Sequence, residues 1–160
     1  MIRRTKNTER LCWLLLCLIL AFIWGNSLLP RETSAALSQW VRRLLSALFP
    51  GGTAPEGEEG HHVLRKLAHA GEFCCLGACA ACLARMYCNK KMQWHLLPLL
   101  GGVTAACVDE TIQCFVPGRG PGLTDVGIDT LGTALGIIMI SLILFLNRKR
   151  TIKILEENKT

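Results

Sequence analysis

Apolar residues fall into four long blocks separated by short charged stretches, at residues 11–29, 67–88, 96–115 and 126–146. A soluble amphipathic helix would carry a polar stripe every three or four residues, and these blocks mostly lack one. Each block is long enough to cross the hydrocarbon core of a bilayer as an α-helix. The pattern predicts an all-α, polytopic membrane protein, with a bundle of about four transmembrane helices in a domain at residues 11–146.

The segments around the blocks are shorter or more polar. A cleaved signal peptide would usually have an apolar part of about 7–15 residues and a small-residue cleavage site, so we expect the first block to remain as a helix. Residues 36–49 have apolar positions three and four apart, with Arg42 and Arg43 on the other side, which predicts an amphipathic helix in the membrane interface. Residues 50–60 are rich in Gly, Pro and Glu and indicate a flexible linker. Residues 147–160 form a charged tail that is expected in the cytoplasm.

The chain has 18 Lys and Arg residues against 12 Asp and Glu, a net charge of +6. The basic residues flank the apolar blocks, which is typical of topology signals and of contact with membrane lipids. The sequence has no helix-turn-helix, zinc-finger or RNA-recognition pattern, so nucleic acid is not an expected partner. With the N-terminus inside, twelve of the 18 basic residues fall on the cytoplasmic side. The positive-inside rule therefore predicts a multi-pass protein of the cytoplasmic membrane with both termini in the cytoplasm.

Nine cysteines are present, most of them in or beside the apolar blocks. Cys79 and Cys82 form a C-x-x-C pair on one helix face, so a metal or redox site is conceivable. A structural zinc site needs four ligands, however, and the sequence has no second C-x-x-C pair. Cysteine is also a small apolar residue that lets helices approach closely, and this interpretation is favoured. No metal and no other cofactor is predicted.

Polar and ionisable residues lie near the ends of the blocks, although a charged group at the centre of a membrane segment costs about 2.5–3.5 kcal/mol on insertion scales. Because successive helices alternate in direction, these residues should all meet at the outer membrane face. Charges scattered at random among loops would not fall at the same membrane face in all four helices. The residues of this expected polar site are Asn26, Ser27, Lys66, His69, Glu72, Asp109, Glu110, Gln113, Arg119, Asp125 and Asp129.

Two interpretations of the polar site remain open. Carboxylates beside a histidine shift one another's proton affinities, as general acid–base catalysis requires, and the catalytic candidates are His69, Glu72, Asp109 and Glu110. The other residues would then bind a substrate, and Arg119 could clamp a phosphate or carboxylate with two N–H groups. Alternatively, the polar groups only satisfy one another by hydrogen bonds between helices, with Arg119 in a salt bridge to Asp109, Glu110 or Asp125.

A G-x-x-x-G pair in the fourth block, Gly132 and Gly136, predicts a surface on which another helix can pack closely. The partner helix can belong to the same chain. The same surface would also allow a homo-oligomer to form through Gly132 and Gly136.

Three motifs follow one another along the chain. They are Lys66-Leu-Ala-His69 with Glu72 and Leu76, Asp109-Glu110-x-x-Gln113-x-x-x-Pro117-Gly118-Arg119, and Asp125-x-x-x-Asp129-x-x-Gly132. With Asn26-Ser27 after the first block, these motifs resemble the VanZ-like family of bacterial membrane proteins, named for a teicoplanin-resistance accessory protein. Phe73 stands where that family often has tyrosine, and Asp129 where many members have asparagine. The Gly120-Pro121-Gly122 stretch lacks the serine frequently found there.

The resemblance implies a function in the bacterial cell envelope and, for some members, low-level resistance to lipoglycopeptides. A binding role would bring a surface lipid or a lipid-linked peptidoglycan precursor to the site, where phosphate and carboxylate groups suit Arg119 and Lys66. An enzymatic role would make the protein a membrane-embedded acid–base hydrolase or transferase. The third hypothesis is a small proton- or ion-coupled transporter, although four helices are few for a transporter that does not dimerise.

Overall fold

The structure, a computed structural model, describes residues 5–30, 33, 43, 57–120 and 122–157. Within these residues it contains four long helices and no strand: α1 (Lys6–Ser27), α3 (Gly57–Tyr87), α4 (Lys91–Gln113) and α5 (Leu123–Glu157). The interfacial helix predicted at residues 36–49 lies outside the described residues, apart from Arg43. The predicted all-α class is confirmed.

Three of the helices are long and apolar enough to cross a membrane, over Lys6–Ser27, Arg65–Tyr87 and Leu123–Arg150. The fourth helix, α4, has a similar length of 23 residues but is interrupted by Pro98. Its last turns also carry Asp109, Glu110 and Gln113, which lower its mean hydropathy. The architecture is a helical bundle of a polytopic membrane protein.

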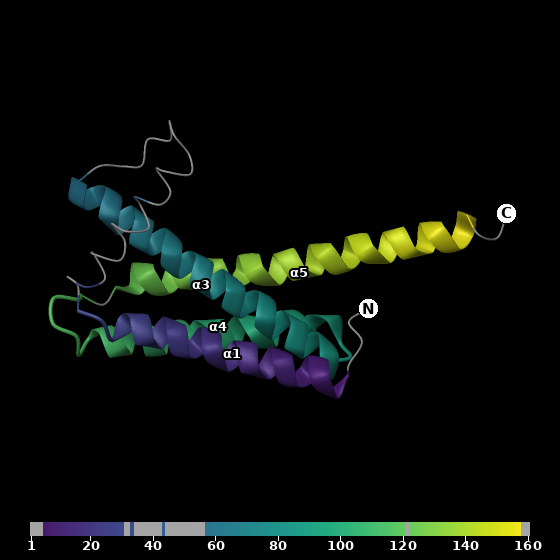
Figure 1. Cartoon of the computed structure of the whole chain (residues 1–160), viewed down its shortest axis with the longest axis horizontal. Coiled ribbons are helices and arrows are strands. Elements are labelled where there is room, and N and C mark those ends of the chain that lie inside the picture. The colour runs from purple at the N-terminus through teal and green to yellow at the C-terminus, as the bar shows by residue number, and fades with distance from the viewer. Residues whose placement is uncertain (1–4, 31–32, 34–42, 44–56, 121, 158–160) are drawn as a thin grey trace.

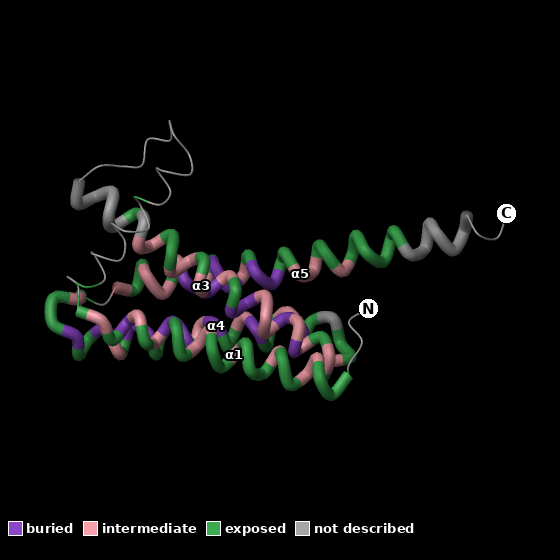
Figure 2. Tube along the Cα trace, viewed as in Figure 1, coloured by how far each residue is buried: buried purple, intermediate pink, exposed green. Residues whose placement is uncertain are grey.

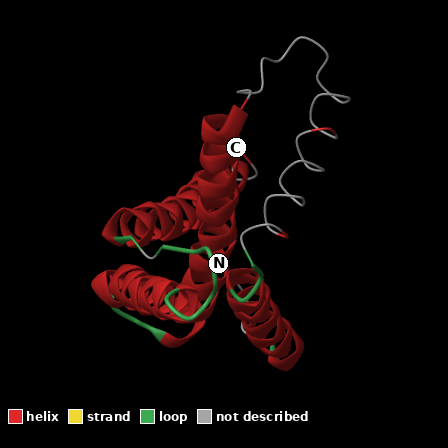
Figure 3. Ribbon diagram, turned by 90° about the vertical axis from the view of Figure 1, so that its left-hand side faces the viewer, coloured by secondary structure: helices red, strands yellow, loops and turns green. Residues whose placement is uncertain are grey.

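Successive helices run in opposite directions (Figure 1). The end of α1, the end of α4 and the start of α5 lie together at the left of the view, and α3 enters the bundle from the same side. The start of α1 and the end of α5 lie towards the opposite side. Seen from the left-hand side, the helices surround a common centre and the described loops face the viewer (Figure 3). We call the left side of Figure 1 the site end of the bundle.

A small apolar core lies between α1, α3 and α4. Phe73 and Ile23 are fully buried there, and Leu76, Ala105 and Ala106 pack against them. Phe73 occupies the place where the resembled family often has tyrosine, and in this chain the ring is a core residue. The small alanines on α4 let the large side chains of α1 and α3 fit between the helices.

Glycines allow α5 to cross α3 at close range. A Cβ atom on Gly136 would lie 2.7 Å from the backbone nitrogen of Ala78, and one on Gly132 would lie 3.1 Å from the carbonyl carbon of Ala70 and closer still to its carbonyl oxygen. The predicted small-residue packing surface is therefore used within the chain. A homo-oligomer through the same glycines stays a prediction.

Thr133 on α5 lies against two further glycines, with its backbone facing Gly77 and its side chain facing Gly102. A Cβ atom on Gly77 of α3 would be 2.9 Å from the Thr133 Cα, and one on Gly102 of α4 would be 2.9 Å from its Cβ. Thr133 is fully buried, and its hydroxyl donates to the Asp129 carbonyl at 3.0 Å. Three helices therefore meet at this residue, one turn from Asp129.

Burial is inverted relative to a soluble protein. Large apolar side chains cover the outside of the helices, including Leu14, Leu18 and Phe22 on α1, which are 56–58% exposed. Polar side chains at the site end are buried instead, and buried segments of the trace face the interior of the bundle (Figure 2). This distribution suits a surface solvated by lipid.

Two helices extend further than the apolar blocks suggested. Residues 57–66, which were expected in a loop and linker, belong to α3. Propagating an existing helix is far easier than nucleating one, so the apolar part of α3 can extend back through Gly57 and Gly60. At the other end, α5 continues through the charged tail as far as Glu157.

Candidate functional site

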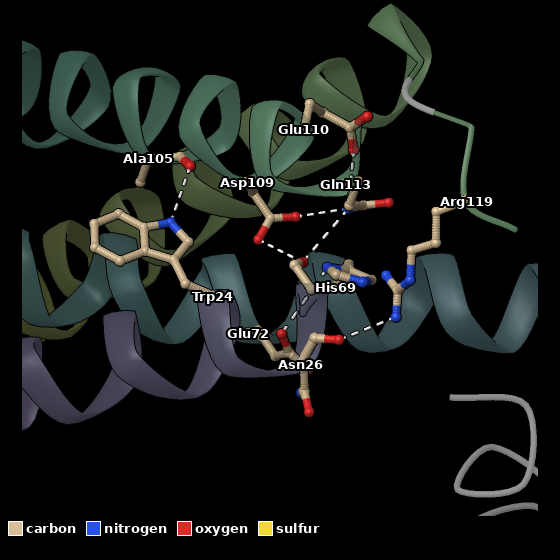
Figure 4. A network of polar contacts seen from close by, with 10 residues as sticks. Trp24, Asn26, His69, Glu72, Ala105, Asp109, Glu110, Gln113 and Arg119 are labelled. Atoms are coloured by element: carbon tan, nitrogen blue, oxygen red, sulfur yellow. Dashed lines mark hydrogen bonds and ion pairs between the residues drawn. The ribbon is translucent and has the colours of Figure 1, made fainter. Parts of the chain in front are cut away.

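The ends of α1 and α4 are joined by buried hydrogen bonds. The Ser27 hydroxyl donates to Asp109 Oδ1 at 2.6 Å, and the Gln113 side-chain amide donates to Asp109 Oδ2 at 2.8 Å. Asp109 and Gln113 are four residues apart on α4, so their side chains share one helix face. Ser27 and Asp109 are fully buried. Both oxygens of the Asp109 carboxylate are therefore satisfied by neutral donors (Figure 4).

Glu110 connects the end of α4 to the start of α5. Its Oε1 accepts from the Gln113 amide at 3.2 Å, and its Oε2 accepts from the backbone N–H of Gly122 at 2.8 Å. Glu110 is only 7% exposed. This carboxylate fixes the loop between α4 and α5 because it binds the backbone just before α5 begins.

Asn26 joins α1 to α3. Its side-chain amide donates to Glu72 Oε1 at 3.0 Å. The other carboxylate oxygen, Glu72 Oε2, lies 3.9 Å from His69 Nδ1, one turn earlier on α3. Both of these atoms are buried and have no hydrogen-bond partner in the described part of the chain. His69 and Glu72 are thus adjacent, with one unsatisfied polar atom each.

Arg119 is anchored by backbone carbonyl groups. Its Nε donates to the Leu29 carbonyl at 3.1 Å, and one terminal nitrogen donates to the Asn26 carbonyl at 3.0 Å. These acceptors lie at the C-terminal end of α1, where the last carbonyls lack the regular helical partner, and the Asn26 carbonyl also accepts from the Leu29 backbone N–H at 3.2 Å. No carboxylate among the described residues forms an ion pair with Arg119. The salt bridge considered from the sequence is therefore absent from this part of the chain, and Arg119 binds the end of α1 instead.

The loop before Arg119 has the conformation that this placement requires. Gly118 has a φ of 77°, in the left-handed region that glycine adopts at low cost. The Arg119 backbone N–H donates to the Val116 carbonyl at 3.2 Å and closes the turn. Partial burial, followed by the proximity of Arg65, lowers the pKa of the Arg119 guanidinium, but arginine stays protonated in proteins.

Lys66 and Asp125 form an ion pair between the starts of α3 and α5, with Lys66 Nζ 2.9 Å from Asp125 Oδ1. The Lys66 side chain is 40% exposed, so the pair lies at the edge of the site. Asp129, one turn further along α5, is only 2% exposed. The two aspartates therefore lie at different depths on the same helix.

A pocket of about 180 Å³ opens between these groups. Its lining includes three basic side chains, those of Arg65, Lys66 and Arg119, and one carboxylate, that of Asp125. A narrower cleft of about 20 Å³ shares Arg65, Lys66 and Asp125 with it and reaches His69 and Asp129. The site thus has a basic opening and a deeper part that contains a histidine and an acid.

Three of the deeper residues converge from three helices. His69 of α3, Asp109 of α4 and Asp129 of α5 each offer one ligand-type atom, and these atoms lie within 4.8 Å of one another. His69 is four residues from the start of the apolar segment at Arg65, about 6 Å along the helix at 1.5 Å per residue. The cluster is therefore inside the bundle but close to its site end.

The structure brings all the sequence-predicted site residues to the site end, as the alternating helix directions predicted. Whether each residue is catalytic or binding stays a prediction. Sequence reasoning did not assign three participants to the site: Arg65, the Gly122 backbone N–H and the carbonyl groups at the end of α1. The position of Arg65 next to Lys66 was a usable signal, whereas backbone groups leave none in a sequence.

Trp24, which precedes the polar residues at the end of α1, makes a further contact with α4. Its indole Nε1 donates to the Ala105 carbonyl of α4 at 3.4 Å (Figure 4). This bond and the Ser27–Asp109 bond hold α1 against α4 along the last turns of both helices.

A model of the VanZ/LLP1 family matches residues 12–145, which is most of the chain and includes every residue of the site. The protein belongs to the VanZ/LLP1 family. The three motifs that suggested this relationship lie together in the structure of this VanZ/LLP1 member, on α3, on α4 with its following loop, and on α5. No curated protein and no solved structure matches the chain.

Proposed function

We propose that this protein acts in the bacterial cell envelope, where its polar site binds the phosphate of a membrane lipid or of a lipid-linked peptidoglycan precursor. Membership of the VanZ/LLP1 family and three helices capable of crossing a membrane support this setting. The proposed orientation places the site end at the outer face of the cytoplasmic membrane and both termini in the cytoplasm, on the distribution of basic residues.

The proposal rests on how the guanidinium of Arg119 is held in the structure. Two backbone carbonyls hold its guanidinium in place, and no described carboxylate forms an ion pair with it. Its side chain lines the 180 Å³ pocket with Lys66 and Arg65. A fixed guanidinium suits a phosphate oxygen pair because its planar N–H groups match that geometry. The pocket therefore favours an anionic headgroup over a neutral one.

A second candidate function is acid–base catalysis on the bound lipid. It is favoured by His69 and Glu72, whose facing atoms are 3.9 Å apart, buried and without a hydrogen-bond partner among the described residues. A substrate group entering between them would supply the missing partner. Binding and catalysis differ in one test: Glu72→Gln should retain ligand binding in both cases, but it should abolish turnover only if the site is catalytic.

The proposed role predicts a drug phenotype. A lipoglycopeptide such as teicoplanin anchors in the outer leaflet, where burial of its tail contributes about 0.8 kcal/mol per CH₂. A site at that depth could alter the display of the drug's target or the anchoring of the drug. Vancomycin has no lipid tail, so tolerance to it should change less.

The test is expression of the full chain in a susceptible Gram-positive host, with minimum inhibitory concentrations of both drugs as the readout. We expect higher tolerance to teicoplanin than to vancomycin, and loss of that tolerance in Arg119→Lys at equal membrane abundance. Arg85→Lys is the matched control, because Arg85 lies over the Trp94 ring at the start of α4, away from the site end. Equal tolerance in Arg119→Lys and the unchanged protein would contradict the proposal.

A further inference from the structure

His69, Asp109 and Asp129 form a compact set of metal-ligand types inside the bundle. They come from three different helices, and their ligand atoms lie within 4.8 Å of one another. Asp109 is fully buried and Asp129 is 2% exposed. Carboxylate and imidazole groups are both ligands of divalent transition metals.

No positively charged side chain among the described residues is paired with the carboxylate of Asp109 or of Asp129. Asp109 is bound only by the neutral side chains of Ser27 and Gln113. The carboxylate of Asp129 has no hydrogen-bond or ion-pair partner within the described residues, although it is almost completely buried. Buried charges in proteins are paired or coordinate metals, because an isolated buried carboxylate is strongly unfavourable.

The nearby basic residues are already engaged elsewhere. Lys66 is paired with Asp125 at the edge of the site, and Arg119 is held by the carbonyls of Asn26 and Leu29. His69 Nδ1 is buried and has no hydrogen-bond partner in the described part of the chain. Its nearest charged neighbour through Nδ1 is Glu72 Oε2 at 3.9 Å, so no hydrogen bond within the described residues keeps the imidazole from turning towards the two carboxylates.

The space beside two of the three residues, His69 and Asp129, suits an ion. The cleft lined by His69 and Asp129 has a volume of about 20 Å³. A cavity needs roughly 10–15 Å³ by this kind of measure to hold one water-sized particle. Zinc binds nitrogen and oxygen at about 2.0–2.2 Å, so a modest side-chain rotation would bring the ligand atoms to bonding distance. The cleft also connects to the larger basic pocket through shared residues, which provides a path for entry.

We propose that His69, Asp109 and Asp129 bind one divalent transition-metal ion at the floor of the polar site. The ion neutralises the two buried carboxylates and links α3, α4 and α5. It retains open coordination positions towards the cleft, which water or a ligand oxygen can fill. This assignment differs from the sequence-based expectation of no metal, and it does not depend on the anion-binding role of Arg119.

The test uses the full chain purified in detergent, stripped with a chelator and titrated with MnCl₂. Manganese is chosen because the nine cysteines would bind zinc through their thiolates, whereas Mn²⁺ prefers oxygen and nitrogen. The electron paramagnetic resonance signal of free Mn²⁺ reports binding without any assay of activity. We expect one Mn²⁺ per chain and at least about tenfold weaker binding in Asp129→Asn and in His69→Asn, since even outer-shell changes cost about 10–100-fold at metal sites.

Asp125→Asn is the matched control. It removes one carboxylate charge from the same helix, one turn before Asp129, but from a residue paired with Lys66. Its Mn²⁺ affinity should stay within about threefold of the unchanged protein, which separates ligation from general electrostatic attraction. Circular dichroism and gel filtration verify that each variant folds. Absence of Mn²⁺ binding to the folded, unchanged protein would overturn the assignment, as would equal affinity in Asp129→Asn. A larger loss in Asp125→Asn than in Asp129→Asn would also overturn it.

Discussion

The Ser27 hydroxyl donates a 2.6 Å hydrogen bond to the Asp109 carboxylate, and both residues are fully buried. This bond joins the last residue of α1 to α4, at the point where the polar side chains of the other helices converge. Asp109 also belongs to the set with His69 and Asp129. The Ser27–Asp109 contact therefore connects the packing of the bundle to the chemistry of its site.

Removal of the Ser27 hydroxyl should destabilise the bundle. Ser27→Ala leaves one buried Asp109 oxygen without a donor, and losses of this kind cost about 1–3 kcal/mol in the free energy of unfolding. Ser141→Ala is the control, because the Ser141 hydroxyl donates to a carbonyl within its own helix. Unfolding in mixed micelles, followed by circular dichroism, should show the larger loss for Ser27→Ala. Equal stability of the two variants would show that Asp109 does not depend on α1.

The close crossing of α3 and α5 gives a second prediction. In isolation, Gly→Ala within a helix is stabilising by about 1 kcal/mol. Gly136→Ala should nevertheless lower the melting temperature, because the new Cβ would collide with the backbone of α3 at Ala78. Gly127→Ala on the same helix has nothing within 4 Å of its Cβ position and should leave the melting temperature unchanged or raised. The same shift in both variants would mean that α5 does not pack on α3 through Gly136.

The arrangement of the site was partly predictable from the sequence. The alternation of apolar blocks places polar residues of four helices at one end, and the four-residue spacing of Asp109 and Gln113 puts both on one face of α4. The contacts of Arg119 could not be predicted, because every residue has a carbonyl group. Which carbonyls accept from Arg119 depends on where α1 ends and on how closely the loop approaches it.

Other features depend on where the helices cross. Thr133 lies against Gly77 and Gly102 only because α3, α4 and α5 meet at that level, and a single sequence does not specify this register. The meeting of His69, Asp109 and Asp129 has the same origin, since each residue belongs to a different motif. The early start of α3 at Gly57 differs from the linker that the glycines of residues 50–60 predict, because a helix can continue through glycine once it has formed.

The orientation of the site end gives a further prediction. Reporter fusions after Leu29 and after Arg119 should indicate the external side, and fusions after Lys91 and after Arg150 the cytoplasm. The reason is the excess of basic residues on the side that carries both termini. Alkaline phosphatase and green fluorescent protein fusions at each position provide complementary signals. A cytoplasmic signal after Arg119 would place the polar site at the inner face and exclude the proposed access from outside.

In the proposed function, the fixed guanidinium of Arg119 binds the phosphate of a lipid. The most direct measurement is native mass spectrometry of the detergent-purified protein with phosphatidylglycerol, with a polyprenyl diphosphate and with uncharged diacylglycerol. We expect both phosphate-bearing lipids to be retained in preference to diacylglycerol. Arg119→Lys should weaken their binding at least about tenfold, since a lost charge-assisted hydrogen bond is worth about 1.5–3 kcal/mol. Arg85→Lys should bind as the unchanged protein does. Equal retention of diacylglycerol, or undiminished phosphate-lipid binding in Arg119→Lys, would contradict the claim.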